Sequence, residues 1–217
     1  YEKDVVNVAR ENGWFKGKDK DFDFKKAYNP YDFSGLRACE ARVWSFFRTF
    51  DKSMDKYKKH IMGDASEEPM PLYIIPDRKV SLADVREGMR NHYEGTELSM
   101  TNDPGAGAYK VPYRWRPMTF KSEGREYFNE RAIATQQTGF VLIAQMRSWL
   151  PDAVGGILWF GVDDANTAVL TPMYTSITEI PECYRRGNGS MTEFSWTSAF
   201  WIHNWVANMA YNRYEPM

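Results

Sequence analysis

The period of the hydrophobic pattern changes along this chain, and that change restricts the possible folds more than any other feature. Between Leu36 and Phe50 the apolar residues recur at the spacing of one face of an α-helix. From Ala132 to Met146 the residues are mostly apolar and often β-branched, which is typical of strands. We therefore predict a mainly helical first half, a second half that mixes antiparallel strands with helix, and an α+β fold class.

Three further segments carry helical signals. Residues 2–12 are predicted to form a short amphipathic helix. Residues 81–93 are predicted to form another, because Ser81 can cap it and Asp84 occupies the capping-box position. Residues 194–211 form an unusually apolar predicted helix, and four of its aromatic side chains are expected to be buried: Trp196, Phe200, Trp201 and Trp205.

The strand signals in the second half come in three runs. The run 132–146 is predicted as one strand, or as two strands broken near Thr138-Gly139. The runs 156–162 and 167–174 flank a four-residue turn, which predicts a hairpin. Pro172 lacks an N–H group, so its strand is expected to lie at the edge of the sheet or to end there.

Length and charge narrow the class of protein. A chain of 217 residues is long enough for one or at most two domains with a sizeable core. Its formal net charge of −1 gives no electrostatic reason to expect nucleic acid or an anionic membrane surface as partner. Its apolar runs are all shorter than a membrane-spanning helix requires.

The two cysteines, Cys39 and Cys183, are the first candidates for a nucleophile. Cys39 falls on the apolar face of the helix predicted at 36–50, which favours a buried structural role over a reactive thiolate. Cys183 lies in a predicted loop, and no histidine has an obvious claim to be its base. The cysteines and histidines form no cluster at metal-ligand spacing, so neither a metal nor another cofactor is predicted.

The remaining polar candidates have ordinary explanations. His92 is near the end of the helix predicted at 81–93, where a protonated imidazole would interact favourably with the helix dipole. His203 lies among aromatic residues and is expected to be a hydrogen-bonded core histidine. Asp163 and Asp164 suit the predicted hairpin turn, and the sequence around them lacks the Gly and the distal Glu of a calcium loop.

Arg131 opens the strand-like run. A guanidinium there could project into a site and hold a carboxylate through two parallel hydrogen bonds. A surface arginine at a strand end is the alternative, and the residue pattern leaves both interpretations open. The Gly-rich loop 101–107 matches neither of the phosphate-binding motifs GxGxxG and GxxxxGK[ST].

Three stretches taken together resemble one known family. They are residues 32–44 (Asp-Phe-Ser-Gly-Leu-Arg-Ala-Cys-Glu-Ala-Arg-Val-Trp), residues 89–96 (Met-Arg-Asn-His-Tyr-Glu-Gly-Thr), and the ordered set from Arg131 through Gln145-Met146-Arg147, Leu150-Pro151 and 155–159 to Thr171-Pro172-Met173-Tyr174. Their order and spacing resemble the middle and later part of the bacterial dipeptidase family of cysteine N-terminal-nucleophile hydrolases. The similarity covers nearly the whole chain.

This resemblance implies an αββα sandwich, in which two antiparallel sheets lie between helical layers. It also implies hydrolysis of dipeptides by a cysteine at the very N-terminus of the mature chain. A free α-amino group has an unperturbed pKa of about 7.7–8.0, so the nucleophile's own amine can act as its general base, without a metal or organic cofactor. The chain departs from this pattern because it begins with Tyr1, and both of its cysteines are internal.

We therefore expect residues 1–217 to be a single, incomplete hydrolase domain, mainly helical over 1–95 and mixed over 109–217. The catalytic nucleophile is expected outside this chain, which alone would be inactive. On the same resemblance Arg131 is expected to face the substrate pocket, with Thr135 on the same face of the strand. The expected partners are a dipeptide and the remainder of the polypeptide, and a homo-oligomer is left open.

Two alternatives accompany this interpretation. Penicillin and bile-salt amidases use the same nucleophile. The resemblance therefore specifies the chemistry, amide hydrolysis by an N-terminal cysteine, more closely than it specifies the substrate. A non-catalytic, aromatic-rich module that binds peptides or glycans is the alternative from another class. That module predicts a complete fold with an exposed aromatic patch. A hydrolase fragment instead predicts open sheet edges or an uncovered apolar face.

Overall fold

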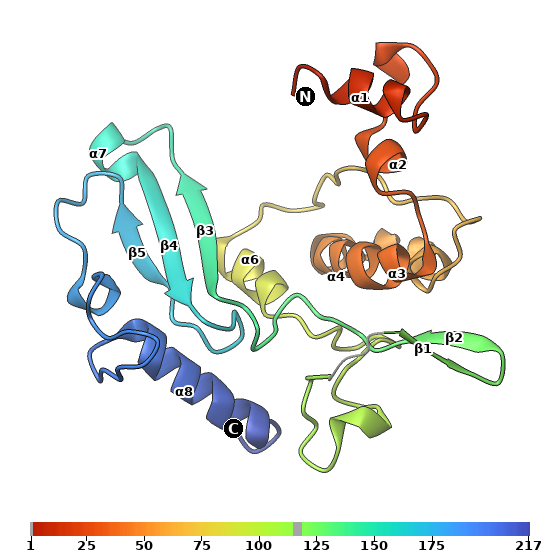
Figure 1. Ribbon diagram of the computed structural model, residues 1–217. Coiled ribbons are helices and arrows are strands. Elements are labelled where there is room, and N and C mark those ends of the chain that lie inside the picture. The colour runs from red at the N-terminus through yellow and green to blue at the C-terminus, as the bar shows by residue number, and fades with distance from the viewer. Residues whose placement is uncertain (1, 115–118) are drawn as a thin grey trace.

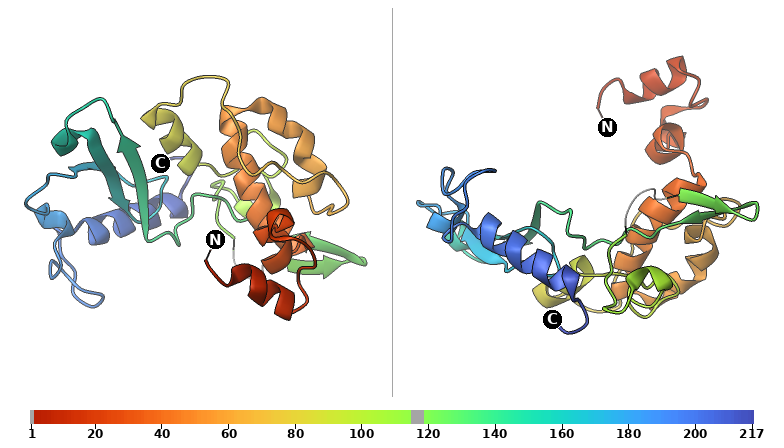
Figure 2. Two further views of the ribbon diagram at one scale, coloured as in Figure 1. Left: turned by 90° about the horizontal axis from the view of Figure 1, so that it is seen from above. Right: turned by 60° about the horizontal axis from the view of Figure 1, so that its bottom comes forward.

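The computed structural model describes residues 2–114 and 119–217, and it has the predicted α+β composition. The helices of the first half gather on one side, while the main sheet and the last long helix, α8, lie on the other (Figure 1). Helix α6 and extended segments connect the two sides, as the views of Figure 2 also show. Tyr1, which the sequence analysis excluded as a thiol nucleophile, lies outside the described residues.

The N-terminal segment forms a small cluster of its own. Helix α1 (Val5–Glu11) confirms the helix predicted at 2–12, and α2 (Phe24–Tyr28) follows it. Ala9, Phe22 and Ala27 are buried together in this cluster. A short 3-10 turn (Asp19–Asp21) lies between the two helices, and others occur later in the chain, at Lys52–Tyr57, Pro104–Ala106 and Glu182–Tyr184.

The helix predicted at 36–50 is present but has an irregular start. It is divided into α3 (Phe33–Gly35), a π-helical turn (Leu36–Glu40) and α4 (Ala41–Phe50). The Ala41 amide donates to the Leu36 carbonyl, five residues back, so the helix is wider there than a regular α-helix. The extra residue changes which side chains face the core. The prediction that Cys39 is buried is wrong: Cys39 is exposed and Glu40 is buried instead.

The largest core lies beneath α4. Trp44 is completely buried there, and its indole Nε1–H donates to the Met54 carbonyl at 2.8 Å. Helix α5 (Lys58–Ile61) contributes the buried Ile61 side chain to the same core. The buried residues of the cluster are Ala41, Trp44, Met54, Tyr57, Ile61, Met70, Tyr93, Leu98, Met100 and Ala132.

Helix α6 (Leu82–Met89) begins as predicted. The Ser81 hydroxyl accepts from the Asp84 amide and the Asp84 carboxylate accepts from the Ser81 amide, which completes the capping box. The helix ends at Met89, four residues before the predicted end. His92 therefore lies beyond the helix, and the proposed interaction with the helix dipole is not its role.

Two antiparallel sheets are present in the second half. Strands β1 (Thr119–Ser122) and β2 (Arg125–Phe128) form a hairpin that the sequence analysis did not predict. Strands β3 (Phe140–Met146), β4 (Gly156–Val162) and β5 (Thr171–Tyr174) form the main sheet in the order β3-β4-β5. The two sheets lie well apart in Figure 1, so the described residues form no two-layered sandwich by themselves.

The main sheet confirms part of the strand prediction. The break near Thr138-Gly139 is real, but residues 132–138 are irregular and only the second part forms a strand. β4 and β5 pair as a hairpin, with a longer connection (163–170) than the predicted four-residue turn. Pro172 lies on β5, an edge strand, as expected. Helix α7 (Asp152–Gly155) joins β3 to β4.

Helix α8 (Ala199–Asn212) ends the fold and confirms the last predicted helix. The four aromatic side chains predicted to be buried are less buried than expected: Trp196, which precedes the helix, is 64% exposed, Phe200 and Trp205 are 41% and 50% exposed, and Trp201 is half-buried. They are exposed because this helix contacts the sheet near one end of β4 and leaves its other side uncovered. Within the described ranges, no helix is both long and apolar enough to cross a bilayer.

Candidate functional site

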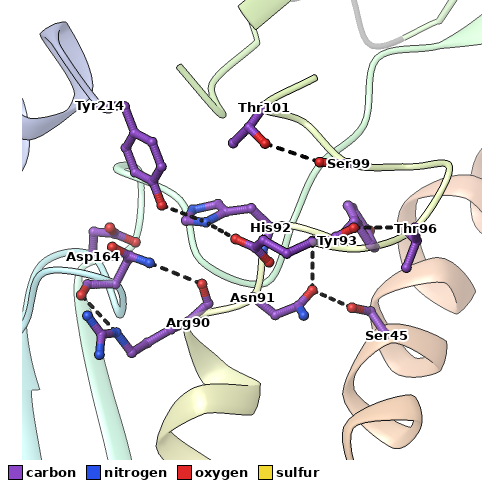
Figure 3. Close-up of polar contacts among 12 residues, drawn as sticks. Ser45, Arg90, Asn91, His92, Tyr93, Thr96, Ser99, Thr101, Asp164 and Tyr214 are labelled. Atoms are coloured by element: carbon purple, nitrogen blue, oxygen red, sulfur yellow. Dashed lines mark hydrogen bonds and ion pairs between the residues drawn. The ribbon is translucent and has the colours of Figure 1, made fainter. Parts of the chain in front are cut away.

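A buried polar network lies where the segment after α6 meets the end of α8 (Figure 3). His92 is at its centre and has no exposed surface. Its Nδ1 atom is 3.1 Å from Oε1 of Glu94, and its Nε2 atom is 3.0 Å from the Tyr211 hydroxyl. The Tyr214 hydroxyl lies 3.3 Å from Nδ1. A histidine predicted to sit at a helix end is thus joined to the C-terminal helix, 119 residues away along the chain.

The network continues to the acidic pair that follows β4. The Tyr211 hydroxyl donates to Oδ2 of Asp164 at 3.0 Å, and Asp164 is completely buried. Asp163 adopts a left-handed backbone conformation with φ of 69° and is 3% exposed. The turn prediction for these residues is correct in position, but both carboxyl groups are buried. Each keeps one oxygen without a hydrogen-bond partner in the part of the chain that the structure describes.

Burial determines how these acids titrate. Burial raises the pKa of Asp163 to about 6, and the adjacent Asp164 charge adds to that effect. Burial also raises the pKa of Asp164, against the opposing effect of the Tyr211 hydroxyl. Burial acts to raise the pKa of Glu94 too, but the combined hydrogen bonds from the His92 ring and backbone prevail and lower it.

Counting hydrogens in this network restricts where its protons can be. A phenol has one proton, so if Tyr211 donates to Asp164, then Nε2 of His92 must donate to the phenol oxygen. Nδ1 faces the Glu94 carboxylate, which can only accept, so Nδ1 also carries a proton. The same protons satisfy every contact if Asp164 is protonated and donates to Tyr211, while Tyr211 donates to a neutral His92. In both arrangements one proton is shared between His92 and Asp164 through Tyr211.

The network also anchors the segment that contains the two predicted site residues. The Tyr93 hydroxyl donates to the Arg131 carbonyl at 3.0 Å, and the Ala134 amide donates to the Asn91 carbonyl at 3.3 Å. The Thr135 amide faces the Asp164 carboxylate and acts to lower its pKa. Because residues 131–135 form these contacts, they cannot continue the strand, and the prediction that Arg131 and Thr135 share a strand face is wrong.

Arg131 and Thr135 nevertheless line one hollow, whose enclosed volume is about 30 Å³. Two neighbouring ion pairs flank it: Arg37 with Glu130, and Arg114 with Asp103. Burial raises the pKa of Glu130 despite its arginine partner. The Arg131 guanidinium forms no ion pair with a carboxylate among residues 2–114 and 119–217. The structure thus brings the two predicted residues together at one hollow.

The other sequence candidates lie elsewhere. Cys39 borders an open apolar groove formed with Arg42, Val43, Phe46 and Met89. Cys183 is half-buried beside α8. Neither thiol is hydrogen-bonded to a histidine in the described part of the chain. His203 is half-buried, with Nδ1 3.3 Å from the Val162 carbonyl, which agrees with a hydrogen-bonded histidine but only partly with a core position.

A metal site has no basis in the described residues, where no three His, Cys, Asp or Glu side chains gather closely enough to hold an ion. The chemistry available at the buried network is therefore that of hydrogen bonds and proton sharing. At the hollow, the available chemistry is that of the Arg131 guanidinium, which has no carboxylate partner among the described residues, beside backbone and hydroxyl groups. An uncompensated guanidinium at a polar hollow is suited to binding an anionic group such as a carboxylate.

The sequence profile of peptidase family C69 matches residues 1–217, and the chain belongs to that family. It is 26% identical to a probable dipeptidase of Salmonella dublin over 170 residues, which cover 78% of this chain and 33% of that protein. It is 27% identical to a probable dipeptidase B of Lactococcus lactis over 219 residues, which cover 98% of this chain and 39% of that protein.

A more distant relative, dipeptidase A of Lactobacillus helveticus, is 21% identical over 176 residues, which cover 80% of this chain and 31% of that protein. The chain thus spans between about a third and two fifths of the length of the curated relatives it matches. The bacterial dipeptidase resemblance of the sequence analysis is confirmed at the level of the family.

Proposed function

We propose that these 217 residues are part of a dipeptidase that hydrolyses dipeptide amide bonds through a cysteine nucleophile outside them. The observation that carries this proposal is the match of the whole chain to peptidase family C69, together with relatives that are named dipeptidases and are much longer. Cys39 and Cys183 support it indirectly, because an internal residue has no free α-amine to act as its own base.

The proposed reaction follows from the chemistry of an N-terminal cysteine. The thiol sulfur attacks the amide carbonyl carbon of the dipeptide, and the α-amine of the same residue takes the thiol proton. The tetrahedral intermediate expels the amine of the second amino acid, which leaves with that proton and yields a thioester. Water then attacks the thioester carbonyl, which releases the first amino acid and regenerates the thiol.

Arg131 and Thr135 are the proposed substrate-binding residues in this chain. A dipeptide always carries a C-terminal carboxylate, and a guanidinium can hold a carboxylate through two parallel hydrogen bonds. Arg131 lines the hollow without a described carboxylate partner, and Thr135 lines the same hollow. The neighbouring arginines are less suited, because Arg37 and Arg114 are already paired with Glu130 and Asp103.

The first test is the intact mass and N-terminal sequence of the native protein from its source cells. A larger chain that begins with cysteine supports the proposal, and replacing that cysteine by alanine should abolish dipeptide hydrolysis. The Cys39→Ser variant is the matched control and should keep full activity, because Cys39 is internal and exposed. A native product that begins at Tyr1 would rule out the cysteine mechanism.

A second candidate function is kept because one observation favours it. Trp196 and Trp205 are 64% and 50% exposed, and their ring centroids are 5.0 Å apart. Exposed paired aromatics are a common feature of surfaces that bind peptides or glycans. Under this alternative the chain is a non-catalytic binding module. Trp196→Ala should then reduce the tryptophan fluorescence change on adding peptides or oligosaccharides, whereas a hydrolase fragment should give no such change.

A further inference from the structure

One face of the main sheet is apolar and largely uncovered. Side chains alternate along β3, so that Val141 and Ile143 are buried while the residues between them point the other way. The strand register places Leu158 of β4 opposite Ala144, on the same side. We call this side the open face. Its exposed members are Phe140, Leu142, Ala144, Met146 and Leu158, of which Phe140, Leu142, Met146 and Leu158 are 62%, 45%, 71% and 40% exposed. Phe160, opposite Leu142, is on the same side but is half-buried against the Tyr184 ring.

The opposite face of the sheet already has its cover. Val141 is buried with Ala134, Ala165 and Ala168, and Met89 of α6 packs against this cluster. Helix α8 covers only the end of the open face nearest Val162, where His203 approaches the Val162 carbonyl. Figure 1 shows α8 crossing at that end of the strands. The open face is therefore not needed for the core that these residues build.

Strand β3 has a second unprotected feature, its outer edge. Its sequence, Phe-Val-Leu-Ile-Ala-Gln-Met, contains no charged residue and no proline. In the described part of the chain it pairs with β4 on one side, and no strand pairs with it on the other. Natural proteins protect sheet edges with charges, prolines, bulges or a covering element, and an apolar edge without them is prone to aggregate. Strand β3 has neither charges nor prolines, so we expect another element to cover its outer edge.

We propose that the open face is covered by the remainder of the same polypeptide, in the part that lies outside these 217 residues. Relatives that align with 78–98% of this chain are only 33–39% covered by it, so most of their length lies elsewhere. A segment of the same chain is present at high effective concentration, unlike a separate partner. The open face carries no charge, which suits an apolar layer rather than a charged ligand.

The proposal depends on the proposed function only in requiring a longer polypeptide, and it can be tested without measuring hydrolysis. Met146 is a natural probe, because it is 71% exposed here and methionine oxidises readily when solvent reaches it. In the native full-length protein, peroxide should oxidise Met146 at least tenfold more slowly than in the same protein denatured in urea. Equal rates in the two states would overturn the proposal.

A pair of substitutions in the full-length protein gives an independent test. Leu142→Asp should lower Tm by about 5 °C or more, because it places a carboxylate in the covered layer. Leu72→Asp is the matched control, since Leu72 is 95% exposed in the connection before α6, and its Tm should be unchanged. Equal Tm values for the two variants would overturn the proposal.

A dilution series separates the two sources of an apolar cover. Protection of Met146 by the same polypeptide is independent of protein concentration, whereas protection by a second copy falls as the protein is diluted. Loss of protection on dilution would therefore overturn the proposal in favour of a dimer. A full-length protein that protects Met146 but hydrolyses no dipeptide would support this inference while contradicting the proposed function.

Discussion

The Tyr211 hydroxyl donates to Oδ2 of Asp164 at 3.0 Å, and both side chains are almost completely buried. This contact joins the last helix to the connection that follows β4. It is also the middle of the path from Asp164 to His92, because the same hydroxyl is 3.0 Å from Nε2 of the imidazole. The stability of the region where the two sides of the molecule meet should thus depend on one phenol oxygen.

Replacing Tyr211 by phenylalanine should test this dependence. The substitution keeps the ring but removes the donor to a buried carboxyl and the partner of the imidazole. Leaving such groups unsatisfied costs about 1–3 kcal/mol in the free energy of unfolding. Urea unfolding of both proteins at pH 7 measures the difference. Tyr214→Phe is the control and should cost less, because Tyr214 is only half-buried and its hydroxyl is 3.3 Å from Nδ1.

The protonation of His92 can be observed directly. Both proton arrangements of the network place a hydrogen on Nδ1, which faces the Glu94 carboxylate. We therefore expect ¹⁵N spectra of histidine-labelled protein to give an Nδ1–H resonance for His92 at pH 7. A neutral ring protonated at Nε2 alone would contradict the hydrogen count and the contacts on which it rests.

Asp163→Asn should stabilise the protein at neutral pH. Burial raises the pKa of Asp163 from 3.8 to about 6, because the folded state favours the neutral carboxyl. The stability that this group contributes is therefore fully present below pH 4 and is lost as the pH rises through 6. Asparagine keeps the shape, tolerates the left-handed backbone and carries no charge. The free energy of unfolding should increase by about 1–3 kcal/mol at pH 7.5 and by close to zero near pH 4. The pKa shift of about two units sets the upper bound of this increase.

Urea unfolding at pH 4.5 and pH 7.5 checks the sign of this effect. Asp77→Asn, at an exposed position in a turn, is the control and should change the stability little at either pH. A gain from Asp163→Asn that is equal at both pH values would mean that the carboxyl is not titrating between them. A loss at pH 7.5 would mean that the charged form has a stabilising partner.

Under the proposed function, Arg131→Gln in the full-length protein should raise the KM for dipeptides about tenfold to a hundredfold with a smaller change in kcat. Losing a hydrogen bond between charged groups costs about 1.5–3 kcal/mol, and 1.4 kcal/mol corresponds to a factor of ten. Steady-state kinetics with one dipeptide and its C-terminal amide measure this. The amide, which lacks the carboxylate, should be affected less. Arg125→Gln, an exposed arginine on β2, is the control. Equal losses for both substrates would exclude carboxylate recognition by Arg131.

Ser81→Ala should cost about 1 kcal/mol in the free energy of unfolding, because it removes the cap of α6. The cap matters for more than the helix itself, since α6 supports both the sheet and the segment that carries His92. Thermal or urea unfolding measures the loss. Ser122→Ala, at the exposed end of β1, should be close to neutral by comparison.

Local sequence signals predicted the elements well where the neighbours along the chain decide the structure. The capping box of Ser81 and Asp84 is one example, because its partners are three residues apart. The β4–β5 hairpin and the position of Pro172 on an edge strand are others. The bacterial dipeptidase resemblance also held, since it depended on ordered motifs rather than on any one residue.

Predictions failed where distant contacts override the local pattern. Residues 132–135 are strand-like in composition, but the Ala134 amide is bonded to Asn91, and the strand cannot start there. The buried network was missed for the same reason, because His92 and Tyr211 are 119 residues apart in sequence. The one local signal for the network is the pair of adjacent aspartates directly after an apolar strand, a pattern that an ordinary turn explains equally well.

The π-helical turn at Leu36–Glu40 has a consequence for how this chain is compared with its relatives. A relative with a regular α-helix at this place needs one residue fewer between Leu36 and Ala41 to keep the following side chains in register. An alignment without a gap would then pair the exposed Cys39 with a buried position of the relative. It would pair the buried Glu40 with the position next to that one in the relative. Any inference about a shared thiol or acid at this turn should therefore be read from superposed backbones and not from aligned letters.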